Sequence, residues 1–346
     1  MNNSHTITHA SLPMQSVGPV KIIGPEVNDE VMVPLATYEQ PLWPSTHRGA
    51  RVTAVSGGIH GVVIDDRMTR SVLLEASDAS EALRLVSELK RKKDEMENVV
   101  GRHSRFTHLL DFHAQFVGNL LYLRFEFKTG DAAGHNMVTA AADQLITWIQ
   151  QAYPEVKYIS ISGNYCTDKK ASAVNGILGR GKNVIAEVTI PQKWVARYLK
   201  STPERIVELH IKKNLIGTML AGGIRTANAH FANVLLAFYV ATGQDGANIV
   251  EGSQGFVHAE IRDVDLYFSV TIPNIIVGTV GNGKEIPFVQ DNLKTLGCFE
   301  KREPGQNARR LAVIAAASVL CGELSLLAAQ THQGELMAAH VKMERS

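Results

Sequence analysis

Residues 162–170, SGNYCTDKK, hold the side chains of this sequence that are most suited to chemistry. They follow a strand predicted at 158–162, and a polar loop after a buried strand keeps working side chains both fixed and accessible. Asp168, Lys169 and Lys170 place two cations beside one carboxylate, a set that can bind an anionic group and stabilise a developing oxyanion. A surface turn with mixed charges fits the same letters equally well, so the residue types alone leave both interpretations open.

An α+β set of helices and strands is predicted to position this loop. The apolar patterns indicate an amphipathic helix at 77–98, strands at 120–128, 158–162 and 184–189, and helices at 139–152, 228–242 and 307–343, the last broken near Gly322 and Gly334. Short apolar runs at 17–55, broken by Gly and Pro, indicate strands and loops. The elements between 77 and 162 look like a compact insert, so we expect a large domain at 1–71 and 161–346 and a small inserted domain at 72–160.

The composition is that of an ordinary globular protein. The chain has 346 residues, of which 45% are hydrophobic and 20% charged, and its net charge of +1 gives no reason to expect nucleic acid or a membrane surface as a partner. Its three cysteines are widely spaced, so no metal or disulfide framework is expected. The amino terminus lacks the order of a signal peptide, and the apolar segment 226–244 contains Asn228, His230 and Asn233, so we expect a cytoplasmic protein without a membrane span.

The loop and many further segments resemble one family. SGNYCTDKK, followed by GRGK at 179–182, resembles the substrate-binding loop of 3-hydroxy-3-methylglutaryl-CoA reductases. Other segments follow in that family's order: ATYE at 36–39, STHRG at 45–49, RMTR at 67–70, GDAAGHNM at 130–137, KNLIG at 213–217, NAHFAN at 228–233, GQD at 243–245, GTVG at 278–281 and GELSL at 322–326. The resemblance covers about residues 17–346 and is closer to the form of eukaryotes and archaea.

The resemblance implies a reaction and a catalytic set. The reaction is the NADPH-dependent four-electron reduction of 3-hydroxy-3-methylglutaryl-CoA to mevalonate and CoA, through a mevaldyl-CoA hemithioacetal. Lys169 matches the lysine that stabilises the oxyanion, and Glu39 matches the proton donor. A glutamic acid ordinarily titrates near about 4.3, so Glu39 must be kept protonated by burial or by a neighbouring carboxylate. Asp245 matches the aspartate that would supply this coupling and organise Lys169 and Lys213.

The departing CoA thiolate needs a proton, which suits a histidine because its pKa lies near the operating pH. His340 matches the family's carboxyl-terminal histidine, and His332 is the rival.

The resemblance also implies an NADPH site, an acyl site and a CoA site. GDAAGHN at 130–136 occupies the dinucleotide motif; it is not a Rossmann fingerprint, and the small NADP-binding domain is expected to be ferredoxin-like as in the family. The implied NADPH contacts are Ser104, Arg105, Asp131, Gly134, Asn136, Gly278 and Arg345, the last matching an arginine that favours NADPH over NADH. The implied acyl contacts are Arg70, Ser162, Asn164, Asp168, Lys170, Lys213 and Asn233, and the implied CoA contacts are Ser45, Arg48, Lys200 and His230.

The family's active site forms between two subunits, so the resemblance implies a homodimer or a higher homo-oligomer. It also implies a non-proline cis peptide between Cys166 and Thr167. Changes from the family's pattern at Tyr38, Trp43 and Arg225 keep open a diverged paralogue that reduces another CoA- or carrier-bound thioester. A non-catalytic CoA- or nucleotide-binding homologue is a third hypothesis, although a binding protein has no need of the whole catalytic set.

Overall fold

The computed structural model describes residues 10–335, 337–338 and 341. His340 and Arg345 of the predicted site lie outside the described residues. The strands are β1 (Met14–Ile23), β2 (Asp29–Ala36), β3 (Ile59–Glu75), β4 (His108–Val117), β5 (Leu120–Lys128), β6 (Lys157–Ser160), β7 (Gly181–Ile190), β8 (Thr226–Ala227), β9 (Gly255–Arg262) and β10 (Asp265–Ile275). The helices are α1 (Leu42–Val55), α2 (Ala79–Arg91), α3 (Lys93–Gly101), α4 (His135–Ala152), α5 (Val174–Leu178), α6 (Gln192–Trp194), α7 (Pro203–Leu209), α8 (Thr218–Leu220), α9 (Phe231–Ala241), α10 (Ile249–Gly252), α11 (Pro287–Thr295) and α12 (Gln306–Gln330), with short segments η1 (Val195–Leu199), η2 (His210–Gly217) and η3 (Gly246–Asn248).

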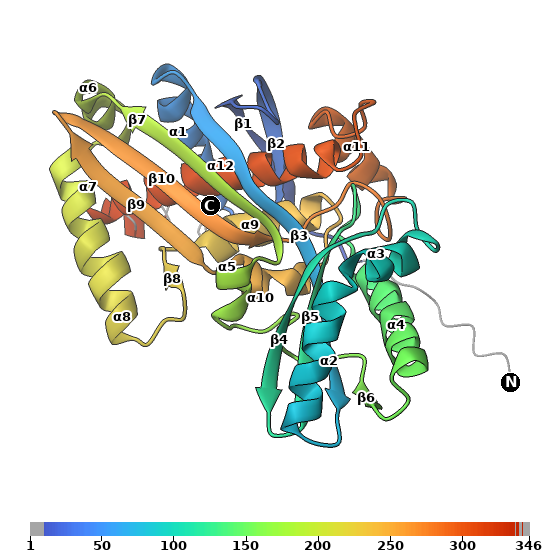
Figure 1. The fold of residues 1–346 in the computed structure, drawn as a ribbon. Coiled ribbons are helices and arrows are strands. Elements are labelled where there is room, and N and C mark those ends of the chain that lie inside the picture. Colours follow the sequence, from blue (N-terminus) through green and yellow to red (C-terminus); the bar gives the residue numbers. More distant parts are fainter. Residues whose placement is uncertain (1–9, 336, 339–340, 342–346) are drawn as a thin grey trace, which may run out of the picture.

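A mixed sheet and a long helix build the larger part of the molecule. The strand order is β2-β1-β3-β7-β10-β9-β8, in which β1 pairs with β3 and β8 with β9 in parallel and the other neighbours are antiparallel. Helix α12 runs across this sheet and packs against α1, α9 and β7 (Figure 1). The predicted α+β class is therefore confirmed.

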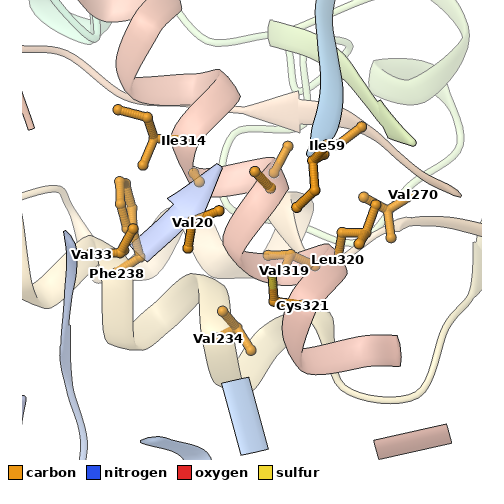
Figure 2. Packing of buried hydrophobic residues seen from close by; sticks show 14 of the residues in the cluster. Val20, Val33, Ile59, Val234, Phe238, Val270, Ile314, Val319, Leu320 and Cys321 are labelled. Atoms are coloured by element: carbon orange, nitrogen blue, oxygen red, sulfur yellow. The ribbon is translucent and has the colours of Figure 1, made fainter. Parts of the chain in front are cut away.

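Helix α12 is the centre of the larger hydrophobic core. By length and composition it is the one helix among the described residues that could cross a membrane, but 94% of its apolar stretch is buried inside the protein, as expected for a core helix. Figure 2 shows Val234 of α9 beside Val319 and Cys321 of α12. The prediction that Gly322 breaks this helix is wrong. A Cβ at Gly322 would lie 2.5 Å from Val234 Cγ2, so glycine serves here to let two helices approach closely.

A second hydrophobic core lies in a smaller unit, hereafter the small module, formed by the second half of β3 with α2, α3, α4, β4, β5 and β6. Its strand order is β6-β3-β5-β4, with every pair antiparallel. Strand β3 belongs to both sheets, since its first half pairs with β7 and its second half with β5 (Figure 1). The two units thus share one continuous strand.

Two further predictions differ from the structure. The segment at 17–55 contains helix α1 as well as strands. Pro44 obscured this helix, although proline is tolerated in the first turn, and Gly49 is needed because a Cβ there would lie 2.0 Å from the carbonyl oxygen of Cys321. The helix predicted at 77–98 is divided at Lys92 into α2 and α3. In contrast, the strand predicted at 120–128 agrees with β5.

Candidate active site

The loop at 162–170 leaves β6 and turns back toward the larger sheet. Its turns come from backbone in the left-handed region at Asn164 (φ 59°), Thr167 (φ 40°) and Lys169 (φ 56°). The expected cis peptide between Cys166 and Thr167 is not present, because positive φ angles make the turn with trans peptides; the cis bond found in the described residues joins Gly18 and Pro19. Cys166 is buried and fixes the middle of the loop, while the charged end stays accessible.

Lys169 and Asp245 form a close ion pair within one chain. Lys169 Nζ lies 2.6 Å from Asp245 Oδ2, and both side chains are less than half exposed. The hydrogen bond to Asp245 raises the pKa of Lys169 above its ordinary value, so the ammonium is secured at neutral pH. Partial burial opposes ionisation of Asp245, but the hydrogen bonds from Lys169 and from the Ala247 N–H outweigh it, and the pKa of Asp245 is lowered.

Asp168 and the Lys169 backbone are held by residues that the sequence did not single out. Arg180 Nη2 donates to Asp168 Oδ1 over 2.7 Å. Glu251 Oε1 accepts the N–H of Lys169 over 3.1 Å. Burial raises the pKa of Glu251, and the hydrogen bond from Lys169 N–H opposes this rise. Arg180 belongs to the GRGK segment, and Glu251 lies on α10, six residues after Asp245. This closeness in sequence to the family's motifs was the one signal that could have identified them.

His135 is a further titratable group near Asp168. Its Nε2 lies 3.2 Å from Asn248 Oδ1 and 3.7 Å from Asp168 Oδ1. Burial lowers the pKa of His135, and the nearby Arg180 guanidinium lowers it further, so the imidazole is neutral at neutral pH. In the sequence, His135 has no predicted role beyond its place in the segment at 130–137.

Glu39 lies apart from the Lys169 cluster. It follows β2, is exposed, and its Oε2 accepts a hydrogen bond from Asn233 Nδ2 over 2.9 Å. In the described part of the chain no ion pair joins Glu39 to Lys169, and the carboxylate of Asp245 is engaged by Lys169 instead. The burial or carboxylate coupling expected for Glu39 is therefore not supplied by the residues that the structure describes.

Three of the four residues predicted to bind CoA meet on one turn of α12. Ser45 Oγ lies 3.0 Å from Ser325 Oγ, and Arg48 Nε donates to the same hydroxyl over 3.0 Å. The N–H of His230 donates to Glu323, a fully buried carboxylate that the sequence did not identify individually.

Of the other predicted substrate residues, two have hydrogen-bond partners within the chain and the rest are exposed. Lys213 lies on η2, and its Nζ donates to Asn214 Oδ1 over 3.2 Å. Burial lowers the pKa of Lys213. No ion pair joins it to Asp245 among the described residues. Arg70 on β3 is held by Thr139 Oγ1 of α4 at 3.0 Å. The remaining predicted positions, Ser162, Asn164, Lys170 and Lys200, are exposed.

The predicted dinucleotide motif forms a tight contact with a second glycine turn. The Asp131 carbonyl accepts the N–H of Thr279 over 2.8 Å, and a Cβ at Gly278 would lie 2.4 Å from the Ala133 nitrogen, so only glycine fits. Helix α4 begins after Gly134 (φ 92°) without a side-chain cap and without an acidic residue in its first turn. Its first N–H groups, which include those of His135 and Asn136, suit an anionic ligand such as a phosphate. The carboxylate of Asp131 itself accepts the N–H of Ala308 and caps α12.

Surface hollows adjoin the other predicted cofactor residues. A depression of about 780 Å³ is lined by Ser104 and Arg105, and one of about 230 Å³ reaches from Ser104 to Met137 on α4. Ser104 Oγ accepts the N–H groups of Phe106 and Thr107, and the Arg105 guanidinium lies 4.7 Å from the ring centre of Phe106. These hollows and the α4 terminus fit an elongated anionic dinucleotide.

The chain is similar to proteins of one family over nearly its whole length. Residues 2–345 match the family model described as hydroxymethylglutaryl-coenzyme A reductase. The 3-hydroxy-3-methylglutaryl-coenzyme A reductase of Pyrococcus horikoshii is 44% identical over 331 residues, which cover 95% of this chain and 80% of that protein. Reductase 1 of Oryza sativa subsp. indica is 41% identical over 346 residues, covering 98% of this chain and 63% of that protein.

A solved structure shares the fold. The class II 3-hydroxy-3-methylglutaryl-CoA reductase of Streptococcus pneumoniae, described as bound to NADPH in open conformations, is 19% identical with a TM-score of 0.76 and covers 95% of this chain and 88% of that one. The α+β architecture built on a buried helix is therefore that of a known class of reductases. The chain belongs to the hydroxymethylglutaryl-coenzyme A reductase family, which confirms the resemblance seen in the sequence.

Proposed function

We propose that this protein reduces 3-hydroxy-3-methylglutaryl-CoA to mevalonate and CoA, with NADPH as the reductant. The observation that carries the proposal is the Lys169–Asp245 pair at 2.6 Å, because it presents a secured ammonium where the family's loop binds substrate. Family membership favours this reaction over a different thioester substrate.

The residues of the chain divide the chemistry among them. When bound, NADPH supplies the hydride for each of the two reduction steps. Lys169 stabilises the oxyanion that develops on the substrate carbonyl, since a positioned cation in a partly enclosed site does this more effectively than water. Glu39 is the proton donor, and one of its oxygens is oriented by Asn233. His340 is proposed to protonate the CoA thiolate, with His332 as the alternative.

The binding regions are proposed from the family resemblance together with the geometry. NADPH is proposed to bind the small module at the hollows beside Ser104 and Arg105, with phosphate at the α4 terminus. Strand order β6-β3-β5-β4, with every pair antiparallel, supports a ferredoxin-like inserted domain at 72–160 and a large domain at 1–71 and 161–346. CoA is proposed to bind at Ser45, Arg48, Lys200 and His230, and the acyl group at Arg70, Ser162, Asn164, Asp168, Lys170, Lys213 and Asn233.

A second subunit is proposed to complete the site. Glu39 is exposed and is not paired with Lys169 among the described residues, so a surface from another copy can cover it and bring a lysine to it. An apolar face near the loop supports this arrangement. Its members are more than two-fifths exposed, and soluble monomers seldom keep such a patch open: Ile177, Leu215, Ile216, Met219, Leu220 and Ile224. We place the homodimer in the cytoplasm.

One observation favours the alternative of a diverged thioester reductase. Arg225 adopts a left-handed backbone (φ 47°) where the family's turn has glycine, and its Nη2 donates to the carbonyl of Gly176. It lines a hollow of about 360 Å³ with Met219 and Phe256 and brings a positive charge to it. The alternative therefore predicts that the protein reduces a thioester with a different acyl group.

The deciding experiment follows the loss of NADPH absorbance and the appearance of mevalonate with purified protein and 3-hydroxy-3-methylglutaryl-CoA. Parallel reactions contain succinyl-CoA or acetoacetyl-CoA. Mevalonate formation with little turnover of the other thioesters is the expected result. Preferential turnover of another thioester would support the diverged reductase, and no turnover of any of them by a folded, NADPH-binding protein would contradict reductase activity.

A further inference from the structure

Two buried charged residues, Arg180 and Glu251, hold the segment that carries Lys169 from its inner side. The Arg180 side chain is 2% exposed, and it donates through Nη2 to Asp168 Oδ1 (2.7 Å) and through Nη1 to the carbonyl of Thr69 (2.7 Å). The Glu251 side chain is fully buried, and its Oε1 accepts the N–H of Lys169 and lies 3.6 Å from Arg180 Nε. Both side chains contact the loop from its buried side, and neither is exposed on the surface on which the substrate is proposed to bind.

The Lys169 backbone needs such support. A non-glycine residue in the left-handed region is strained and persists only where its neighbours enforce it. Lys169 has φ 56°, and the two ends of the residue are held separately, the N–H by Glu251 and the ammonium by Asp245. The geometry of the ammonium therefore depends on the buried carboxylate as well as on the exposed one.

Arg180 and Glu251, hereafter the clamp, are also connected to the small module. Arg124 on β5 is fully buried and donates to the carbonyl of Gly179, the residue before Arg180. Glu126 on the same strand is fully buried beside Arg124, with Arg124 Nη1 at 2.5 Å from Glu126 Oε1. A chain of buried charges thus runs from the small sheet to Arg180, and from there to Asp168.

We propose that Arg180 and Glu251 are positioning residues for the reduction, acting through Asp168 and Lys169 without contacting the reacting atoms. This inference rests on the function proposed above. A purely structural role would affect the stability of the fold, whereas a positioning role also sets how precisely the ammonium meets the developing oxyanion. Misplacement by about 1 Å can cost about 10²-fold in rate.

The molecule offers a matched control. Arg310 resembles Arg180 in burial and in partners: it is 6% exposed, donates to the carbonyl of Leu296 (2.7 Å) and to Asp29 Oδ2 (3.0 Å), and lies on α12 away from the loop. Arg180→Met and Arg310→Met remove the same group from equivalent environments. Both are expected to lower the urea midpoint, but only Arg180→Met is expected to lower kcat, by about 10²-fold with a smaller change in KM.

Amide hydrogen exchange supplies a readout that needs no substrate. Arg180→Met should speed exchange across residues 162–170, and Arg310→Met should not. Equal loss of kcat in the two variants, or unchanged exchange and kcat in Arg180→Met, would overturn the proposal. If Arg180→Met fails to fold, as judged by circular dichroism, Arg180→Lys takes its place in the same comparison.

Glu251 is tested by a conservative rescue. Glu251→Gln keeps an oxygen that can accept the N–H of Lys169, whereas Glu251→Leu removes it. The glutamine variant should keep slow exchange at Lys169 and most of kcat, and the leucine variant should lose both. Equal losses in the two variants would show that the hydrogen bond is not what positions Lys169. An inactive wild-type protein would refute the proposed reaction, while the exchange data would still decide whether the clamp exists.

Discussion

Lys169 and Glu39, the two groups proposed to act on the same carbonyl, have opposite environments. Lys169 is held at both ends by Asp245 and Glu251, and its neighbour Asp168 is fixed by buried Arg180. Glu39 is exposed and has Asn233 as its partner in the described chain. One half of the chemistry is thus pre-organised within a chain, whereas the other half stands open on the surface. The proposed second subunit would account for this difference, because it would cover Glu39 and complete the site on assembly.

The largest expected effect tests the pre-organised half. Lys169→Ala should lower kcat by about 10²–10³-fold, the usual consequence of removing one group that stabilises an oxyanion. Lys212→Ala is the control, since Lys212 on η2 is exposed and pairs with Glu208. Steady-state kinetics and circular dichroism should show a folded, nearly inactive Lys169→Ala protein beside a normal control. Substantial turnover by Lys169→Ala would contradict the assigned role.

A mixing experiment tests whether the open half is completed by a second copy. Glu39→Gln and Lys169→Ala should each be inactive, but subunit exchange between them should restore about a quarter of wild-type activity, because half of the dimers are mixed and each mixed dimer has one intact site. Activity is measured before and after the two proteins are incubated together. A mixture that stays inactive after subunit exchange has been demonstrated would place Glu39 and Lys169 in the same chain's site.

Asp245→Asn should have a smaller effect and should reveal itself through pH. Hydrogen bonding to Asp245 raises the pKa of Lys169, so its removal lowers that pKa and the ammonium is lost at a lower pH. The alkaline limb of the kcat/KM profile should therefore move to lower pH. Asp263→Asn is a suitable control at an exposed aspartate in the β9–β10 turn. An unmoved alkaline limb would show that Asp245 does not sustain the charge of Lys169.

The smallest effect concerns the scaffold that both halves share. Helix α9 carries Asn233 near its start, and Asp245 follows its end. Gly322→Ala should push against Val234 and lower the free energy of unfolding by about 1–3 kcal/mol, as overpacking does. Gly101→Ala, at a helix end with open space around the added methyl group, should be neutral or slightly stabilising. Urea unfolding of both variants measures this difference, and equal midpoints would contradict the tight crossing.

Sequence patterns predicted the elements with strong local signals and failed where distant contacts decide. Alternation predicted β5, and apolar patterns predicted α4 and α9 to within a few residues. Helix α1 was missed because Pro44 and Gly49 interrupt its apolar pattern. Gly49 is required by a close contact with α12, far along the chain, and no local pattern shows that requirement.

The same limit applies to the site. The motif at 162–170 identified Asp168 and Lys169, but not their buried partners Arg180 and Glu251. The hydrogen bond between Glu39 and Asn233 joins residues 194 positions apart. Such pairs are set by how the sheet and α9 pack, and a one-dimensional pattern contains no record of that packing.

The chain passes between the two units at β3 and again at the loop after β6. The first passage is an unbroken strand, which resists sliding but permits twisting. The second is the segment that ends in Lys169. A rotation of the small module about the strand would therefore pull on the loop that carries Lys169. If NADPH binds that module as proposed, nucleotide binding and the orientation of the ammonium would be mechanically coupled.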